Sequence, residues 1–117
     1  MTTSHTDPDT PVTVCFCGSM RFMPAMLEAS IDESLAGRIV VLPLVNMKAP
    51  DARWSTDEQR ERIKTALDTL HLAKIARADE VLIINPGRYI GESTRREIAY
   101  AHQLGKPVRY LVPMEAS

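Results

Sequence analysis

The sequence predicts an α/β fold in which a short parallel sheet of about four strands carries helices on both faces. Two observations carry this prediction: four apolar runs have the length of strands, and segments with helical periodicity separate them. Strands and helices that alternate at this spacing indicate a parallel sheet with right-handed crossovers. The predicted plan is therefore three-layered and Rossmann-like, of the flavodoxin-like kind.

The predicted strands differ little in character. The run VTVCFC at residues 12–17 is β-branched and nearly all apolar, which is typical of a strand covered on both faces. RIVVLPLV at residues 38–45 is the second strand, EVLIIN at 80–85 the third, and PVRYLV at 107–112 the fourth.

The first helix is predicted over about residues 22–36. Leu27, Ile31 and Leu35 recur four residues apart, which is a helical period, and Gly37 stands where a helix ends.

The second and third helices have start signals as well as periodicity. Ser55 stands three residues before Glu58, the pattern of a capped helix start, and helical spacing continues to about residue 76. The third helix is predicted over residues 93–104 and ends at Gly105.

Composition restricts the classes of function. The 117 residues suit one domain, predicted over residues 12–117 after a polar, flexible tail at 1–11. The net charge of −1 comes from interspersed charges, which argues against a nucleic-acid polymer and favours a small-molecule partner. No apolar run is long enough to span a membrane, and the polar start lacks the apolar core of a signal peptide, so we expect a cytoplasmic protein.

The two cysteines of the chain lie in the first predicted strand. Cys15 and Cys17 are two residues apart, so a strand points both to the same face, and a disulfide closing so small a loop would be strained. No second Cys or His cluster supplies further metal ligands. We therefore predict buried, reduced thiols, with no metal site and no cofactor.

Ligands of such sheets bind beyond the carboxyl ends of the strands. The loop after the first strand contains Gly18, Ser19, Met20 and Arg21, which together suit an anion or form a plain turn. The second loop, NMKAPDARW, contains Trp54, which either stacks on a planar base or packs as a loop anchor.

The third loop has the most binding features. Gly87 and Gly91 bracket a segment that includes Tyr89, and the next helix starts through Ser93 and Thr94. Backbone N–H groups and two hydroxyls therefore converge where an anion or a sugar could bind.

Glu97 has two interpretations. It can close a capping box with Thr94, three residues earlier. Alternatively, because it lies beside the core-facing positions Ile98 and Ala101, it is a half-buried carboxylate that acts as nucleophile or general acid/base. His71 also has two interpretations. It lies on the apolar stripe of the second helix, where it is either a hydrogen-bonded core residue or a catalytic residue.

With these motifs in place, the chain resembles the nucleoside 2-deoxyribosyltransferase-like superfamily over about residues 12–112. The first loop and the stretch ADEVLIINPGRYIGESTRREIAYAHQLGKPV carry the resemblance. It implies cleavage of the N-glycosidic bond of a nucleoside or nucleotide, with Glu97 attacking C1′. The loop around Gly91, Ser93 and Thr94 would hold the sugar or the 5′-phosphate, and residues 18–21 would line the other side. The resembling families also imply a homodimer or higher homo-oligomer.

A second resemblance points to the same bond. The third loop is similar to that of the phosphoribohydrolases that release cytokinin bases from nucleoside monophosphates. The matching positions are Cys17, Gly18, Ser19, Pro86, Gly87, Gly91, Thr94 and Glu97.

One position departs from the first family. Its members commonly place an aspartate on the second helix, eight residues before the position of Asp79, and this chain has His71 there, with Asp68 nearby as a substitute. Transfer, hydrolysis and a non-catalytic nucleotide-binding or sensing module therefore stay open, and so does a plain scaffold domain.

Overall fold

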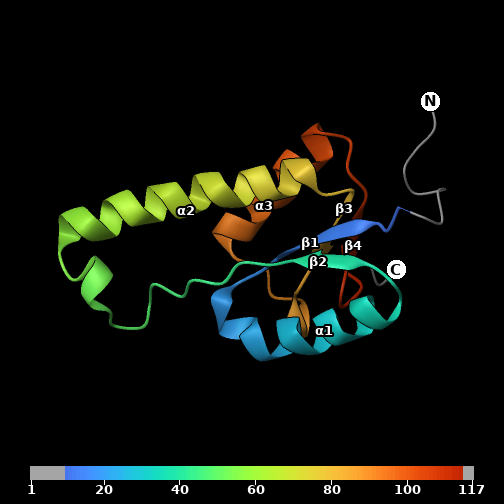
Figure 1. The fold of residues 1–117 in the computed structure, drawn as a ribbon, viewed down its shortest axis with the longest axis horizontal. Helices are drawn as coiled ribbons and strands as arrows, with labels where there is room; N and C mark the ends of the chain where they lie inside the picture. The colour runs from blue at the N-terminus through green and yellow to red at the C-terminus, as the bar shows by residue number, and fades with distance from the viewer. Residues whose placement is uncertain (1–9, 115–117) are drawn as a thin grey trace.

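The computed structural model describes residues 10–114, so the tail predicted for residues 1–11 lies almost entirely outside the described residues. The α-helices and strands follow in the order β1 (Thr13–Cys17), α1 (Met23–Leu35), β2 (Ile39–Val41), α2 (Asp57–Arg77), β3 (Glu80–Ile83), α3 (Glu92–Gln103) and β4 (Val108–Tyr110). Figure 1 shows the sheet between α1 on one side and α2 with α3 on the other. The predicted three-layer α/β fold is thus confirmed.

All strand pairs are parallel, and the strand order is β2-β1-β3-β4. The chain moves to one side of β1 to form β2 and then to the other side to form β3. This reversal creates a switch point beyond the carboxyl ends of β1 and β3, where ligands of such sheets bind.

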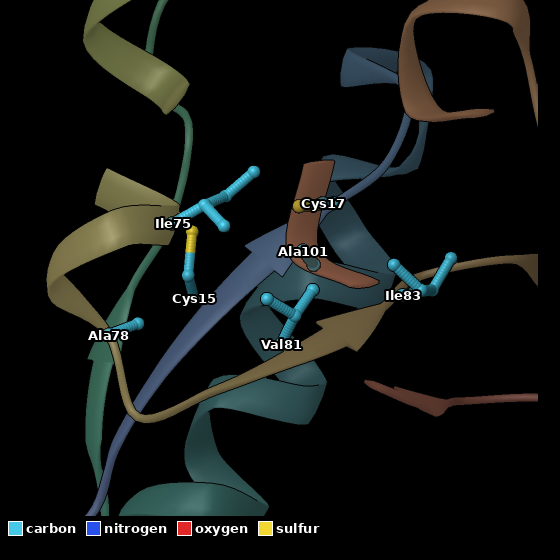
Figure 2. Close-up of a cluster of buried hydrophobic side chains, with 7 residues drawn as sticks. All are labelled: Cys15, Cys17, Ile75, Ala78, Val81, Ile83 and Ala101. Atoms are coloured by element: carbon cyan, nitrogen blue, oxygen red, sulfur yellow. The ribbon is translucent and has the colours of Figure 1, made fainter. Parts of the chain in front are cut away.

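The core has two parts because side chains alternate along β1. Val14 and Phe16 pack with Met26 and Ala29 of α1. Cys15 and Cys17 lie on the opposite face, as predicted, among residues of α2, β3 and α3. Figure 2 shows this second cluster, which consists of Cys15, Cys17, Ile75, Ala78, Val81, Ile83 and Ala101.

The apolar stripe of α1 does not face the core. Leu27, Ile31 and Leu35 are exposed, and the buried residues of the helix are Met26, Ala29 and Glu33. The small side chain of Ala29 fits against the sheet. Glu33 tolerates burial because Arg109 and Arg38 both form ion pairs with it.

The start of α2 lies one residue later than predicted. Thr56, not Ser55, is the N-cap, and its capping box is completed by Gln59 instead of Glu58. Gln59 Oε1 accepts hydrogen bonds from the backbone N–H groups of both Ser55 and Thr56, and this double acceptance fixes the start. The helix then runs beyond the edge of the sheet (Figure 1).

The second predicted strand is much shorter in the structure, because β2 ends at Val41. The chain from residue 42 to 56 instead crosses towards α2 as a loop with one short 3-10 helix, Ala52–Trp54. This loop is the outer wall of the candidate site. No helix among residues 10–114 is long and apolar enough to cross a membrane.

Candidate functional site

A cleft of about 400 Å³ opens at the switch point. Its walls come from the loop after β1, the loop after β2, one face of α2 and the first turns of α3. The lining residues are Gly18, Met20, Pro43, Val45, Asn46, Met47, Lys48, Arg60, Lys64, Leu67, Asp68, His71, Ser93 and Glu97. Five of the predicted site residues are among them: Gly18, Met20, His71, Ser93 and Glu97.

Glu97 lies at the buried end of the cleft and does not cap α3. The helix begins at Glu92 with Gly91 as its N-cap, so Thr94 is already inside the helix and is buried. The carboxylate of Glu97 is therefore more than a turn past the N-cap amide, which makes the predicted capping box wrong. Its side chain is 18% exposed, and Oε1 lies 3.8 Å from Nε2 of His71.

His71 joins Glu97 to the two cysteines of β1. Its Nε2 lies 3.4 Å from Sγ of Cys17 and 3.9 Å from Sγ of Cys15. The other ring nitrogen, Nδ1, is buried and has no hydrogen-bond partner among residues 10–114. Side-chain alternation on β1, one turn of α2 and the second turn of α3 thus place two thiols, an imidazole and a carboxylate in one group.

The electrostatics of this group follow from burial and mutual contact. Burial raises the pKa of Glu97, although the neighbouring His71 opposes the effect. Burial alone disfavours the imidazolium of His71, but the Cys15 thiol and Glu97 outweigh burial and raise the pKa of the ring. The hydrogen bond between the thiols lowers the pKa of Cys15 to about 6, and the same bond together with burial raises the pKa of Cys17.

Sequence reasoning missed the polar wall of the cleft. Arg60, Lys64, Asp68 and His71 recur at three- and four-residue spacing along α2, which places them on one helix face. Lys64 Nζ pairs with a carboxylate oxygen of Asp68 at 3.0 Å, and Arg60 donates to the carbonyl oxygen of Met47 at 3.2 Å. The three- and four-residue spacing of these polar residues could have indicated from the sequence that they share one face of α2.

The architecture has a counterpart among solved structures. The chain is similar to the 2-deoxyribosyltransferase of the psychrotolerant bacterium Bacillus psychrosaccharolyticus, with a TM-score of 0.59 and 21% sequence identity over 84% of this chain and 70% of that one. The two chains share a fold. No family model and no curated protein sequence matches the chain.

Several predicted residues lie outside the cleft of this deoxyribosyltransferase fold. Arg21 places its guanidinium 4.6 Å from the ring centroid of Tyr89 and donates from Nε to Ser19 Oγ. These three residues join the first and third loops to each other. Gly87, Gly91 and Thr94 likewise do not line the cleft.

Trp54 also lies away from the cleft lining. Its side chain is buried in the second loop, and its Nε1 donates to the carbonyl oxygen of Ala49 at 2.9 Å. The structure thus favours the loop anchor over a stacking platform. The neighbouring loop residues Asn46, Met47 and Lys48 line the cleft instead.

Gly18 is needed for packing as well as for access. A Cβ atom at this position would lie 2.7 Å from the backbone oxygen of Ile84, which follows β3. The absent side chain lets the first loop approach the end of the neighbouring strand, and this approach shapes the cleft rim in the deoxyribosyltransferase fold.

Proposed function

We propose that the protein cleaves or transfers the N-glycosidic bond of a nucleoside or nucleoside 5′-monophosphate, with Glu97 as the nucleophile at C1′. One observation carries the proposal: a partly exposed carboxylate lies beside a buried imidazole at the inner end of a cleft, at the switch point of a deoxyribosyltransferase fold. The two family resemblances of the sequence meet at the same residue.

The chemistry needs few groups. The Glu97 carboxylate attacks C1′ as the bond to the base nitrogen breaks, and the base leaves with the bonding electron pair and takes up a proton. The negative carboxylate also stabilises the oxocarbenium-like transition state. Water then releases the sugar in hydrolysis, or a second base accepts it in transfer.

His71 is assigned as a positioning residue for the nucleophile. It occupies the place where the resembling family has an aspartate, and its Nε2 faces Glu97 at 3.8 Å. Proximity of the ring favours the ionised carboxylate against the cost of its burial. Asp68 lies one turn earlier on the same face of α2 and lines the same cleft.

The charges on the cleft wall support a phosphorylated substrate. Lys48, Arg60 and Lys64 line the cleft together with Ser93, whose hydroxyl lies in the first turn of α3. Cations and a helix N-terminus suit a 5′-phosphate. We therefore include nucleoside 5′-monophosphates in the substrate class.

The test is release of free base from a panel of nucleosides, nucleoside 5′-monophosphates and NAD, followed by chromatography. Glu97→Gln keeps the shape of the side chain and removes the nucleophile, so we expect a loss of about a thousandfold or more. Glu92→Gln is the matched control, because that side chain is 89% exposed on the same helix. Its rate should equal that of the wild type.

Equal base release by wild type and Glu97→Gln would overturn the role of Glu97. Thermal stabilisation of both proteins by one nucleotide, with no base released by either, would instead establish a nucleotide-binding module without turnover.

A further inference from the structure

Cys15 and Cys17, which do not line the cleft, and His71, which does, together have the geometry of a metal site. Sγ of Cys15, Sγ of Cys17 and Nε2 of His71 all lie within 4.8 Å of one another, and all three residues are buried. The two sulfur-to-nitrogen distances are 3.9 and 3.4 Å. Figure 2 shows both cysteines on β1, within the cluster between the sheet and the helices α2 and α3.

These separations match tetrahedral coordination. With bonds of about 2.3 Å to sulfur and about 2.0 Å to nitrogen, a tetrahedral zinc ion separates its sulfur and nitrogen ligands by roughly 3.5 Å. The observed distances bracket that value, so an ion fits with small side-chain movements. Thiolate and imidazole ligands select zinc-class ions, whereas magnesium and calcium require oxygen ligands.

Packing alone leaves this group poorly explained. Nε2 of His71 faces the sulfur atoms of two cysteines, which are weak hydrogen-bond partners as thiols but strong metal ligands as thiolates. A disulfide between cysteines two residues apart on one strand would be strained.

We propose that Cys15, Cys17 and His71 bind one zinc-class ion, with the carboxylate of Glu97 as the fourth ligand. Oε1 of Glu97 lies 3.8 Å from Nε2 of His71, whereas nitrogen and oxygen ligands on one tetrahedral ion lie roughly 3.3 Å apart, so the carboxylate must move by about 0.5 Å to bind. The two thiols lose their protons to solvent as the ion binds. An ion held in this way occupies the carboxylate assigned as the nucleophile.

Binding of the ion and cleavage of the substrate are therefore mutually exclusive at Glu97. This consequence rests on the proposed function, whereas the metal site itself does not. We expect zinc to inhibit base release and a chelator to restore it, and we expect magnesium to have no effect.

The binding test uses cobalt(II) as a spectroscopic probe on the full chain after treatment with a chelator. Two thiolate ligands give sulfur-to-cobalt charge-transfer absorption in the near ultraviolet, which should saturate at one ion per chain and disappear when zinc is added. Cys15→Ser and Cys17→Ser should each reduce this absorption, and the double variant should lack it. The control is His102→Ala, which removes an exposed histidine from α3.

A second measurement covers the case in which the buried serine variants do not fold. Zinc should raise the melting temperature of the wild type and slow the labelling of its thiols, and magnesium should do neither. The proposal is overturned if cobalt gives no charge-transfer band, or if the band persists in the folded double variant.

Measuring base release with and without zinc distinguishes the proposed metal site from the proposed function. If cobalt binds through the thiols but zinc leaves base release unchanged, Glu97 is not the fourth ligand and that part of the proposal fails. If the metal-free protein releases no base from any substrate while cobalt binds as expected, the proposed function fails and the metal site stands.

Discussion

The two faces of the sheet use the same strand for different purposes. On the α1 face, Phe16 and Val14 of β1 belong to an apolar cluster with Met26 and Ala29 of α1. On the other face, Cys15 and Cys17 of the same strand contact His71, which faces Glu97. One strand thus contributes to an apolar cluster on one face and, on the other, to a core cluster whose thiols also contact His71, because consecutive residues point in opposite directions.

The largest expected effect is a difference in unfolding free energy between substitutions on the two faces of β1. Phe16→Ala removes a fully buried ring on the α1 face and should lower the free energy of unfolding by about 3–5 kcal/mol. Cys17→Ala on the opposite face removes a single sulfur atom and should cost about 1 kcal/mol. Urea unfolding of both variants measures the difference, and equal losses would contradict the division.

The second prediction concerns the buried charges on the α1 face. Arg109 forms ion pairs with Glu33 and Glu80, so Arg109→Met leaves Glu33 paired with Arg38 alone. We expect the free energy of unfolding to fall by about 2 kcal/mol. The loss is smaller than for a fully buried pair because the Arg109 side chain is 39% exposed. Urea unfolding at pH 7 measures this loss.

The same ion pairs predict a dependence on pH. The hydrogen bond from Arg109 lowers the pKa of Glu33, so this carboxylate stabilises the fold above its unfolded pKa and loses that contribution as the pH falls through the folded value. The urea midpoint of the wild type should therefore fall more steeply with acid than that of Arg109→Met. Parallel curves would show that the pair contributes nothing.

The next prediction concerns Gly18, at the rim of the cleft. Gly18→Ala places a Cβ atom 2.7 Å from the backbone oxygen of Ile84, so the first loop must shift. We expect a loss of about 1–2 kcal/mol in unfolding free energy, together with weaker substrate binding from the displaced rim. Thermal unfolding and KM measure the two effects, and a variant unchanged in both would show that the loop tolerates the atom.

The smallest expected effect lies on the exposed wall of the cleft. Asp68→Asn breaks the ion pair with Lys64, in which both side chains are more than half exposed. Such a pair contributes less than about 0.5 kcal/mol, so stability should hardly change. If base release nevertheless falls by an order of magnitude or more, Asp68 acts in place of the aspartate that the resembling family has at the position of His71.

The elements, and the end of the sheet where the candidate site lies, could be predicted from the sequence alone. Strand-length apolar runs alternate with helical periods, which is local information, and it sufficed to predict the parallel sheet. Of the predicted site residues, only Gly18, Met20, His71, Ser93 and Glu97 line the cleft. The sequence did not determine the rotation of α1, because Leu27 and Ile31 give the same period whichever face is buried.

Which side chains contact one another depends on how the elements pack. Thr94 and Glu97 have the spacing of a capping box, but α3 begins early enough to carry Glu97 past the N-cap and towards α2. Cys17 and His71 are 54 residues apart in the chain, and their contact depends on the strand order and on how α2 packs against β1. Sequence periodicity specifies which face of an element a residue occupies, whereas packing specifies what that face contacts.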